Sequence, residues 1–226
     1  MQTIILVGGK GERLRPLTND RPKCMVIVNG KPIVEYQVEW LKRNGIRKIT
    51  FACGYLHEVI KDYFKDGKEF GVEINYSIES EPLGRGGALK KAWSTIKSEE
   101  SIVVTNGDVY SEIKLTDVIN VHLTKKVKAT VCLFNFKSPY GIVNFDGDSM
   151  VQKFEEKPIL PYWINGGIYI LSPTVKPILP DRGDHETTTF QYLVQNKKMY
   201  AFKSSSYWIG VDTVKDVNEF VSYLNR

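Results

Sequence analysis

Residues 3–23 read TIILVGGKGERLRPLTNDRPK and are the most informative stretch for the fold. Residues 3–7 form a short apolar run rich in β-branched side chains, which predicts a buried first strand. Gly8, Gly9 and Gly11 break this run at once, so a loop is expected directly after the strand. Because glycine has no Cβ, the backbone N–H groups of such a loop can approach a phosphate closely. The stretch therefore predicts a strand that leads into an anion-binding loop.

The same loop is rich in positive charge. Its cations are Lys10, Arg13, Arg15, Arg21 and Lys23. They supply the countercharge that a triphosphate requires. The Walker pattern GxxxxGK[ST] is absent, and Leu14 fills the third glycine position of the dinucleotide pattern GxGxxG. The alternative is a solvated loop whose basic side chains only face water.

Strands and helices alternate at short intervals along the first half of the chain. Predicted strands are residues 48–53, 73–78 and 101–105, and predicted helices are residues 34–43, 58–64 and 87–96. This alternation favours parallel strands joined by crossover helices. Asp108 follows the strand that ends at Thr105, and the carboxyl ends of parallel strands are where open α/β sheets bind ligands.

The second half of the chain has a different pattern of predicted elements. Predicted strands at residues 129–135, 141–145, 152–155 and 167–171 are linked by short turns, which indicates a more mixed sheet. Residues 189–195 and 214–224 read as helices that flank a strand at 199–202. There is no internal repeat and no Pro/Ser-rich linker, so the two halves are expected to share one continuous sheet.

Composition excludes several classes of protein. The chain has 226 residues, 42% of them hydrophobic, and a net charge of +5 that is scattered, without the basic stripe of a nucleic-acid binder. Cys24, Cys53 and Cys132 lack the spacing of a zinc or redox site and read as reduced core thiols. No segment has the roughly 18 consecutive apolar residues of a membrane span. We expect a cytoplasmic protein that binds neither nucleic acid nor membrane.

The pattern GGxGxRLxPLT with a Pro-Lys pair shortly after it resembles the signature of the sugar-1-phosphate nucleotidyltransferases. The resemblance implies an α/β fold, a Rossmann-like three-layer sandwich whose mixed, predominantly parallel central sheet is flanked by helices. It implies one domain over residues 1–226, with residues 1–110 mainly nucleotide-binding and residues 111–226 mainly sugar-phosphate-binding. Many relatives carry a C-terminal left-handed β-helix, but the sequence has no hexapeptide repeat, so none is expected here.

The resemblance also assigns residues to the nucleotide. Arg13, Lys23 and Asp108 are the expected catalytic residues, Arg13 acting on the leaving pyrophosphate and Lys23 on the α-phosphate. The expected nucleotide-binding residues are Leu6, Gly8, Gly9, Gly11, Glu12, Arg13, Lys23, Glu81, Gly84 and Asn106. Glu81 and Gly84 belong to EPLGRGGA at residues 81–88, where Arg85 stands in place of the family's usual Thr. A plain glycine-rich turn before a helix is the alternative for that segment.

Four residues of the second half match the family's sugar-binding motifs in order and spacing. They are Gly141, Glu156, Lys157 and Asn165. Sugar hydroxyls call for a carboxylate and an amide, which Glu156 and Asn165 offer, and the 1-phosphate calls for a cation, which Lys157 offers. The alternative for the EEKP stretch is an exposed charged turn. Asp184-His185-Glu186 precedes a helix where the family often carries Ser-x-Glu-x-Asp, and only Glu186 fits that pattern.

Asp108 and Asp212 are the expected metal ligands, with Mg²⁺ as the cofactor. Mg²⁺ usually takes one or two carboxylates and completes its shell with phosphates and water. The segment Trp208-Ile209-Gly210-Val211-Asp212-Thr213 resembles the family's WxDxGT, but Gly210 takes the Asp position. Either Asp212 reaches the metal from two residues along, since alternate residues of an extended chain share a side, or the second ligand is missing.

The implied reaction joins a nucleoside triphosphate (NTP) and a sugar 1-phosphate, giving a nucleotide sugar and pyrophosphate. The motifs resemble those of mannose-1-phosphate and heptose-1-phosphate guanylyltransferases more than uridylyl, thymidylyl or adenylyl enzymes acting on glucose 1-phosphate. A homodimer is left open. The rivals are a non-catalytic nucleotide-sugar-sensing subunit of the same fold and, more remotely, a nicotinamide-dependent oxidoreductase.

Overall fold

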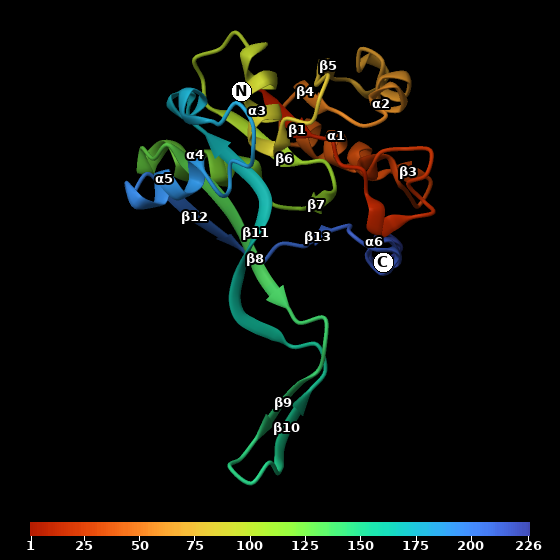
Figure 1. Cartoon of the computed structure of the whole chain (residues 1–226), viewed down its shortest axis with the longest axis vertical. Helices are drawn as coiled ribbons and strands as arrows, with labels where there is room; N and C mark the ends of the chain where they lie inside the picture. The colour runs from red at the N-terminus through yellow and green to blue at the C-terminus, as the bar shows by residue number, and fades with distance from the viewer.

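A seven-stranded sheet runs through the molecule in this computed structural model, which describes residues 1–226 (Figure 1). Its strands, in spatial order, are β12 (Met199–Ser204), β8 (Ala129–Lys137), β11 (Ile159–Leu171), β6 (Ile102–Asn106), β1 (Thr3–Leu6), β4 (Lys48–Cys53) and β5 (Glu73–Ile78). Only β11 runs antiparallel to its neighbours, β6 and β8. The other pairs are parallel. Both halves of the chain therefore contribute to one mixed, mainly parallel sheet, as the sequence predicts.

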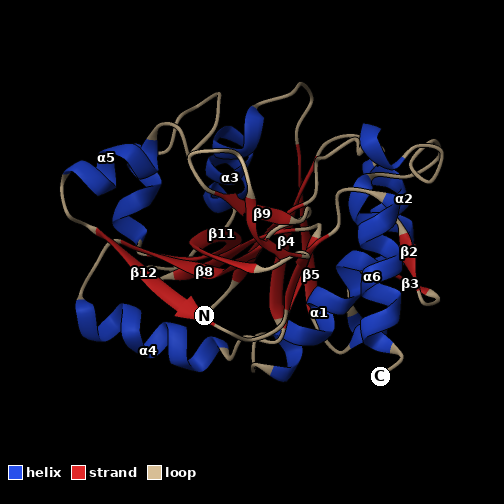
Figure 2. Cartoon of the chain, turned by 90° about the horizontal axis from the view of Figure 1, so that it is seen from below, coloured by secondary structure: helices blue, strands red, loops and turns tan.

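Helices cover both faces of this sheet (Figure 2). They are α1 (Ile33–Arg43), α2 (His57–Phe64), α3 (Gly84–Ser94), α4 (Leu115–Lys125), α5 (Thr189–Gln195) and α6 (Val214–Leu224). Adjacent residues of a strand point to opposite faces. Ile5 and Val103 accordingly join a core with α1, α2 and α4, whereas Ile4 and Val104 join a second core with α3 and α5. The result is the expected three-layer sandwich, and residues 1–226 contain no β-helix.

Several element boundaries differ from the sequence-based expectation. Helix α3 begins at Gly84 and ends at Ser94, a shift of a few residues toward the N-terminus. Strand β11 begins at Ile159, eight residues before the expected start at Gly167, because its first half is hydrogen-bonded to the end of β8. Helix α4 was not foreseen, although it packs Leu115 and Val118 into the core.

A two-stranded hairpin projects far from the body (Figure 1). It consists of β9 (Ile142–Phe145) and β10 (Val151–Glu155), which pair antiparallel. The ends of β8 and β11 form its base, since Ile159 pairs with Lys137. We refer to residues 137–163 as the arm.

Two small sheets lie beside the main one. Strands β2 (Ile27–Val28) and β3 (Lys31–Pro32) pair with each other, and β7 (Val109–Ser111) pairs with β13 (Trp208–Gly210). In the second pair Gly210 lies opposite Val109, and the Val211 amide donates a hydrogen bond of 2.9 Å to the Asp108 carbonyl. This pairing brings the C-terminal segment up to the end of β6.

Helix α6 begins directly after this segment and is fixed by a capping box. The Thr213 hydroxyl accepts a bond from the Asp216 amide, and the Asp216 carboxylate accepts from the Asp212 and Thr213 amides at 3.0 and 2.7 Å. These bonds give partners to the amides of Asp212, Thr213 and Asp216, so the cap stabilises both α6 and the segment that carries Asp212.

We expect Thr213→Ala to lower the free energy of unfolding by about 1 kcal/mol, since it removes the capping oxygen. Urea denaturation followed by circular dichroism measures this loss. Ser222→Ala is the matched control, because the Ser222 hydroxyl only donates to the Asn218 carbonyl within the same helix. Equal stability of the Thr213→Ala variant and the wild-type chain would contradict the role of the cap.

No helix of the chain combines the length and the apolar character that a bilayer crossing requires.

Candidate active site

The glycine-rich loop after β1 is held against its own basic tail. The Lys23 amide donates to the Gly9 carbonyl at 3.1 Å, and the Thr18 hydroxyl donates to the Gly11 carbonyl at 2.8 Å. Gly11 has a φ of +69°, and a Cβ there would lie 2.9 Å from side-chain carbons of both Lys23 and Thr18. Only glycine fits such a position without strain. The loop is thereby folded back so that Lys23 returns to the end of β1.

A cleft of about 320 Å³ opens at the carboxyl ends of β1 and β6. This volume lies at the lower end of the range found for small-molecule sites. Of the residues expected to bind a nucleotide, Leu6, Gly8, Gly9, Lys23, Gly84 and Asn106 line it, as does Asp108, the expected metal ligand. Gly11, Glu12, Arg13 and Glu81 do not line it. Glu81 instead forms an exposed ion pair of 3.6 Å with Arg182.

The far wall of this cleft is the start of α3. Gly84 has a φ of +75°, and a Cβ there would lie 2.6 Å from the Gly183 carbonyl oxygen. The Gly86 amide donates to that same oxygen at 2.8 Å. The glycines of the segment therefore allow α3 to pack directly on the loop that precedes α5.

Two residues of this region contribute to the site without belonging to a sequence motif. Glu79 lines the cleft, and its carboxylate accepts a bond of 3.1 Å from the Leu83 amide. Buried Gln37 donates from its amide nitrogen to the carbonyls of Asn106 and Val109, each at 2.5 Å, and so braces the turn that carries Asp108. Neither residue lies in a recognisable motif, because each is identified only by its contacts in the folded chain.

A second cavity of about 370 Å³ adjoins the first. Its lining includes Arg13, Asp108, Asn165, Glu186, Trp208, Gly210 and Asp212. Arg85, Asn106 and Asp108 line both cavities. The two spaces therefore meet at the end of β6, at the side chain of Asp108.

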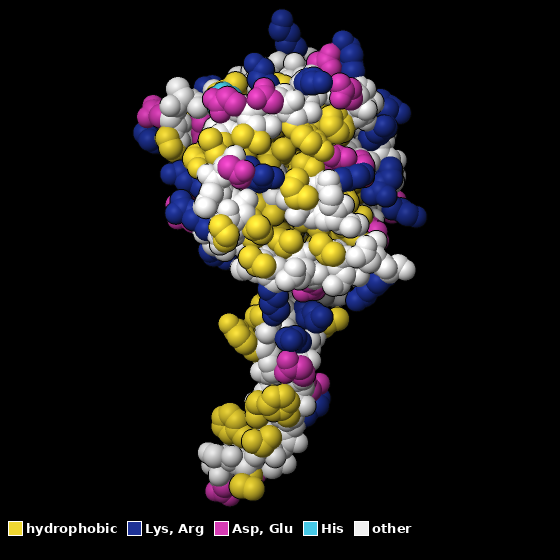
Figure 3. All heavy atoms as spheres, turned by 90° about the vertical axis from the view of Figure 1, so that its right-hand side faces the viewer, with side chains coloured by type: hydrophobic (Ala, Val, Ile, Leu, Met, Phe, Trp, Pro, Cys, Tyr) yellow, Lys and Arg dark blue, Asp and Glu magenta, His cyan; other side chains and the backbone are white.

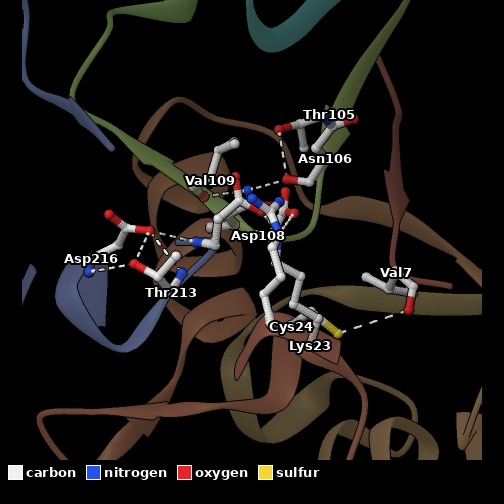
Figure 4. A network of polar contacts seen from close by, with 12 residues as sticks. Val7, Lys23, Cys24, Thr105, Asn106, Asp108, Val109, Thr213 and Asp216 are labelled. Atoms are coloured by element: carbon white, nitrogen blue, oxygen red, sulfur yellow. Dashed lines mark hydrogen bonds and ion pairs between the residues drawn. The ribbon is translucent and has the colours of Figure 1, made fainter. Parts of the chain in front are cut away.

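Charged side chains converge at this meeting point (Figure 4). The Lys23 ammonium contacts the carboxylate of Asp108 and lies 2.5 Å from that of Asp212. Arg13 donates to Asp212 at 2.8 Å. Asp108 and Asp212 thus come together although they lie in opposite halves of the sequence.

The local environment fixes the charge states of this cluster. Burial disfavours the charged form of Lys23, but the attraction and hydrogen bond of Asp108, supported by Asp212, raise the pKa of Lys23 above its ordinary value. Burial likewise works against ionisation of Asp212, yet Lys23 and then Arg13 hold the pKa of Asp212 below its usual range. Both shifts favour the charged forms of Lys23 and Asp212 at neutral pH.

A second polar network lies in the other cavity. Glu186 accepts hydrogen bonds from the Asn165 amide at 2.8 Å and from the Tyr169 hydroxyl at 2.6 Å. Arg85 lies 2.8 Å from Glu186 and also contacts the Asp184 carboxylate. Arg85, which replaces the family's usual Thr, therefore links the wall of the first cavity to the amide and carboxylate of the second.

The remaining sugar-motif residues lie elsewhere. Gly141, Glu156 and Lys157 cluster on the arm, where a Cβ on Gly141 would be 3.0 Å from a Glu156 carboxylate oxygen. The Lys157 ammonium is 3.4 Å from Glu156, and 44% of its side chain is exposed. None of the three lines either cavity. Of the four residues expected to bind the sugar phosphate, only Asn165 lines the second cavity.

No group of three or more His, Cys, Asp or Glu side chains forms a metal cluster in the chain. The nearest arrangement is the pair of carboxylates, Asp108 and Asp212, on either side of the Lys23 ammonium. Two carboxylates suit Mg²⁺, which takes most of its remaining ligands from phosphates and water.

Comparison with known proteins agrees with this geometry. The family model described as nucleotidyl transferase matches residues 2–225. This chain belongs to that family. A mannose-1-phosphate guanyltransferase of Pichia angusta is 38% identical over 227 residues; the match covers 96% of this chain but 62% of that protein. The chain thus spans less than two thirds of the length of this relative.

A bacterial relative has nearly the same length. The D-glycero-α-D-manno-heptose 1-phosphate guanylyltransferase of Campylobacter jejuni is 38% identical, with 98% of this chain and 99% of that protein covered. Among solved structures, HddC from Yersinia pseudotuberculosis in complex with GMP-PN matches with a TM-score of 0.79 and 28% identity over 99% of both chains. The fold and the family expected from the glycine-rich loop are therefore confirmed.

Proposed function

We propose that this chain transfers a guanylyl group from GTP to mannose 1-phosphate or a heptose 1-phosphate, releasing pyrophosphate. One observation carries the proposal: two ligand-sized cavities meet at Asp108, and Lys23 lies at their junction between two carboxylates. A reaction between two phosphates requires such a shared point, because both anions must be held against their mutual repulsion.

The nucleotide is assigned to the first cavity. Every residue that lines it comes from residues 1–110, including the backbone of Gly8 and Gly9. The sugar phosphate is assigned to the second cavity, where Asn165 and Glu186 offer an amide and a carboxylate to hydroxyl groups. Guanine is favoured over other bases because the two relatives above are named guanylyltransferases.

Lys23 and Arg13 perform the electrostatic work of the reaction. An oxygen of the sugar phosphate attacks the α-phosphorus in line with the departing pyrophosphate. Lys23 is positioned to neutralise the charge that develops on the α-phosphate. The family resemblance assigns Arg13 to the leaving pyrophosphate, and in this structure Arg13 lines the second cavity. Mg²⁺, held by Asp108 and Asp212, would supply further neutralisation of the phosphate oxygens. A phosphate monoester is already largely dianionic at neutral pH, so the chain needs no general base.

Since no histidine takes part, we expect the pH dependence of kcat/KM to follow the substrate. The rate should fall about tenfold per unit below the second pKa of the sugar phosphate, about 6, and stay level above it to about pH 8.5. His122 and His185 line neither cavity, and burial lowers the pKa of both. A 2-fluoro sugar 1-phosphate, whose phosphate is more acidic, should move the profile to lower pH. A profile that keeps its position with this analogue would indicate a titrating group of the protein.

A substrate matrix tests the proposal as a whole. The chain is incubated with Mg²⁺, each of GTP, ATP, UTP, CTP and dTTP, and a panel of sugar 1-phosphates, and pyrophosphate release is measured. We expect the highest kcat/KM with GTP and a mannose-type sugar. The highest value with UTP or dTTP and glucose 1-phosphate would correct the substrate assignment. Nucleotide binding without turnover of any pair would instead identify a nucleotide-sensing subunit.

A further inference from the structure

The arm carries an apolar face that nothing in the chain covers (Figure 3). In the β9–β10 hairpin, Phe145 pairs with Val151 and Val143 with Phe154, and cross-strand partners share a face. The side chains of Phe145 and Phe154 are 67% and 66% exposed. Nearer the body, the arm also exposes Ile159, Tyr162 and Trp163.

Such a hairpin has little stability of its own. An isolated pair of strands is marginal in water and needs a third element packed on its apolar face. Its outer edges also remain open to further pairing. Exposed apolar surface of this extent marks a site of protein association.

The arm also holds two residues assigned to the sugar phosphate by the proposed function, Glu156 and Lys157. The ladder between β8 and β11 continues beyond Ile159, where the Ser138 amide donates to the Pro158 carbonyl at 2.9 Å. Asn165 pairs with Leu133, so the five residues from Leu133 to Ser138 separate Pro158 from Asn165 by about 16 Å. Lys157 lies further out still, and the ladder holds it away from its own cavity.

The second cavity lacks a free cation. Its lining contributes two cations, Arg13 and Arg85, against three carboxylates, Asp108, Glu186 and Asp212. Both arginines already pair with carboxylates. Lys23 lines only the first cavity, and the proposed function assigns it to the α-phosphate of the nucleotide. Beyond the Mg²⁺ proposed at Asp108 and Asp212, a dianionic sugar phosphate therefore calls for a cation from outside this lining. Lys157 has that charge, and its only ion-pair partner is the adjacent Glu156.

We propose that two copies of this chain exchange arms, so that the arm of each packs its apolar face on the other and places Lys157 at the other copy's second cavity. This inference rests on the proposed function, because it takes Lys157 as a ligand of the sugar phosphate. Stable interfaces use roughly 20–30 residues from each partner. The arm, residues 137–163, is long enough to supply them. A two-fold axis would serve both sites with one interface.

Complementation between two inactive variants tests the exchange. Lys157→Ala removes the ammonium group assigned to the sugar phosphate and leaves the cavities intact. Asp108→Asn disables the cavities and leaves the arm intact. Co-expressed with different tags and purified through both, the two chains form heterodimers in which one of two sites has both working parts. We expect the purified heterodimer to recover about half of the wild-type rate of pyrophosphate release. Heterodimers as inactive as the parent variants would overturn the exchange, as would a Lys157→Ala chain with wild-type kinetics.

Sedimentation velocity provides a readout that does not need turnover. We expect the wild-type chain to sediment as a dimer and the double variant Phe145→Ser, Phe154→Ser as a monomer. That monomer should still bind GTP, while its KM for the sugar phosphate rises at least tenfold. A monomeric wild-type chain, or a double variant that remains dimeric, would overturn the exchange. A dimer that pairs through the arm yet turns over no substrate pair would overturn the proposed function instead.

Discussion

Replacing Lys23 with Met will lower kcat/KM for pyrophosphate release on the order of 1,000-fold. Lys23 lines the nucleotide cavity and contacts both carboxylates at the junction of the two cavities. Preorganised charges of this kind act where charge develops in the transition state, and removing one costs about 100- to 1,000-fold. Its loss also leaves Asp108 and Asp212 without their shared cation, so the larger value is expected. Steady-state kinetics under saturating Mg²⁺ measures the effect.

Lys10→Met is the matched control for this substitution. Lys10 belongs to the same loop, is exposed, and lines neither cavity. We expect its kcat/KM to stay within about threefold of the wild-type value, because surface charges outside the site contribute little. Thermal unfolding shows whether each variant is folded. A folded Lys23→Met chain with wild-type turnover would remove Lys23 from the mechanism.

Replacing Asp212 with Asn will lower kcat on the order of 100-fold and raise the concentration of Mg²⁺ needed for half-maximal rate. Asp212 stands two residues from the position at which the family motif has its aspartate, but it reaches Lys23 at 2.5 Å and Arg13 at 2.8 Å. The neutral amide keeps the shape of the side chain and removes the charge that a cation would balance. Titration of the rate with Mg²⁺ separates lost metal affinity from lost catalysis.

Asp20→Asn is the control for the loss of a carboxylate, since Asp20 is exposed and pairs only with neighbouring Arg21. It should not change the Mg²⁺ requirement. If Asp212→Asn also leaves both the rate and the Mg²⁺ requirement unchanged, then the second carboxylate at the junction has no part in the reaction. Asp108 would then be the only acidic ligand that the chain offers there.

The sequence predicts the features that depend on local chemistry. Gly11 and Gly84 stand in glycine-rich motifs that are visible in the sequence, and their positive φ values in the structure explain why glycine is required there. Asp108 is recognisable because it follows a buried parallel strand. The alternating strands predicted the layers and the continuous sheet, since one apolar period fixes which residues face each core.

Features that arise from long-range packing were not predictable in this way. Asp212 approaches Asp108 only because β13 pairs with β7, and both strands are three residues long, too short to show a period. Glu79 and Gln37 act through contacts across the fold rather than through a motif. The position of Lys157 on the arm depends on the ladder between β8 and β11, which begins eight residues earlier than the apolar pattern suggests.

The most direct test of the account is calorimetric titration of GTP into the wild-type chain with Mg²⁺ and with EDTA. If the loop, Lys23 and the two carboxylates form a site for a metal-bound triphosphate, Mg²⁺ should strengthen binding at least tenfold, and Asp108→Asn should abolish that gain. Equal affinity with Mg²⁺ and with EDTA, or a gain that survives in Asp108→Asn, would contradict the account.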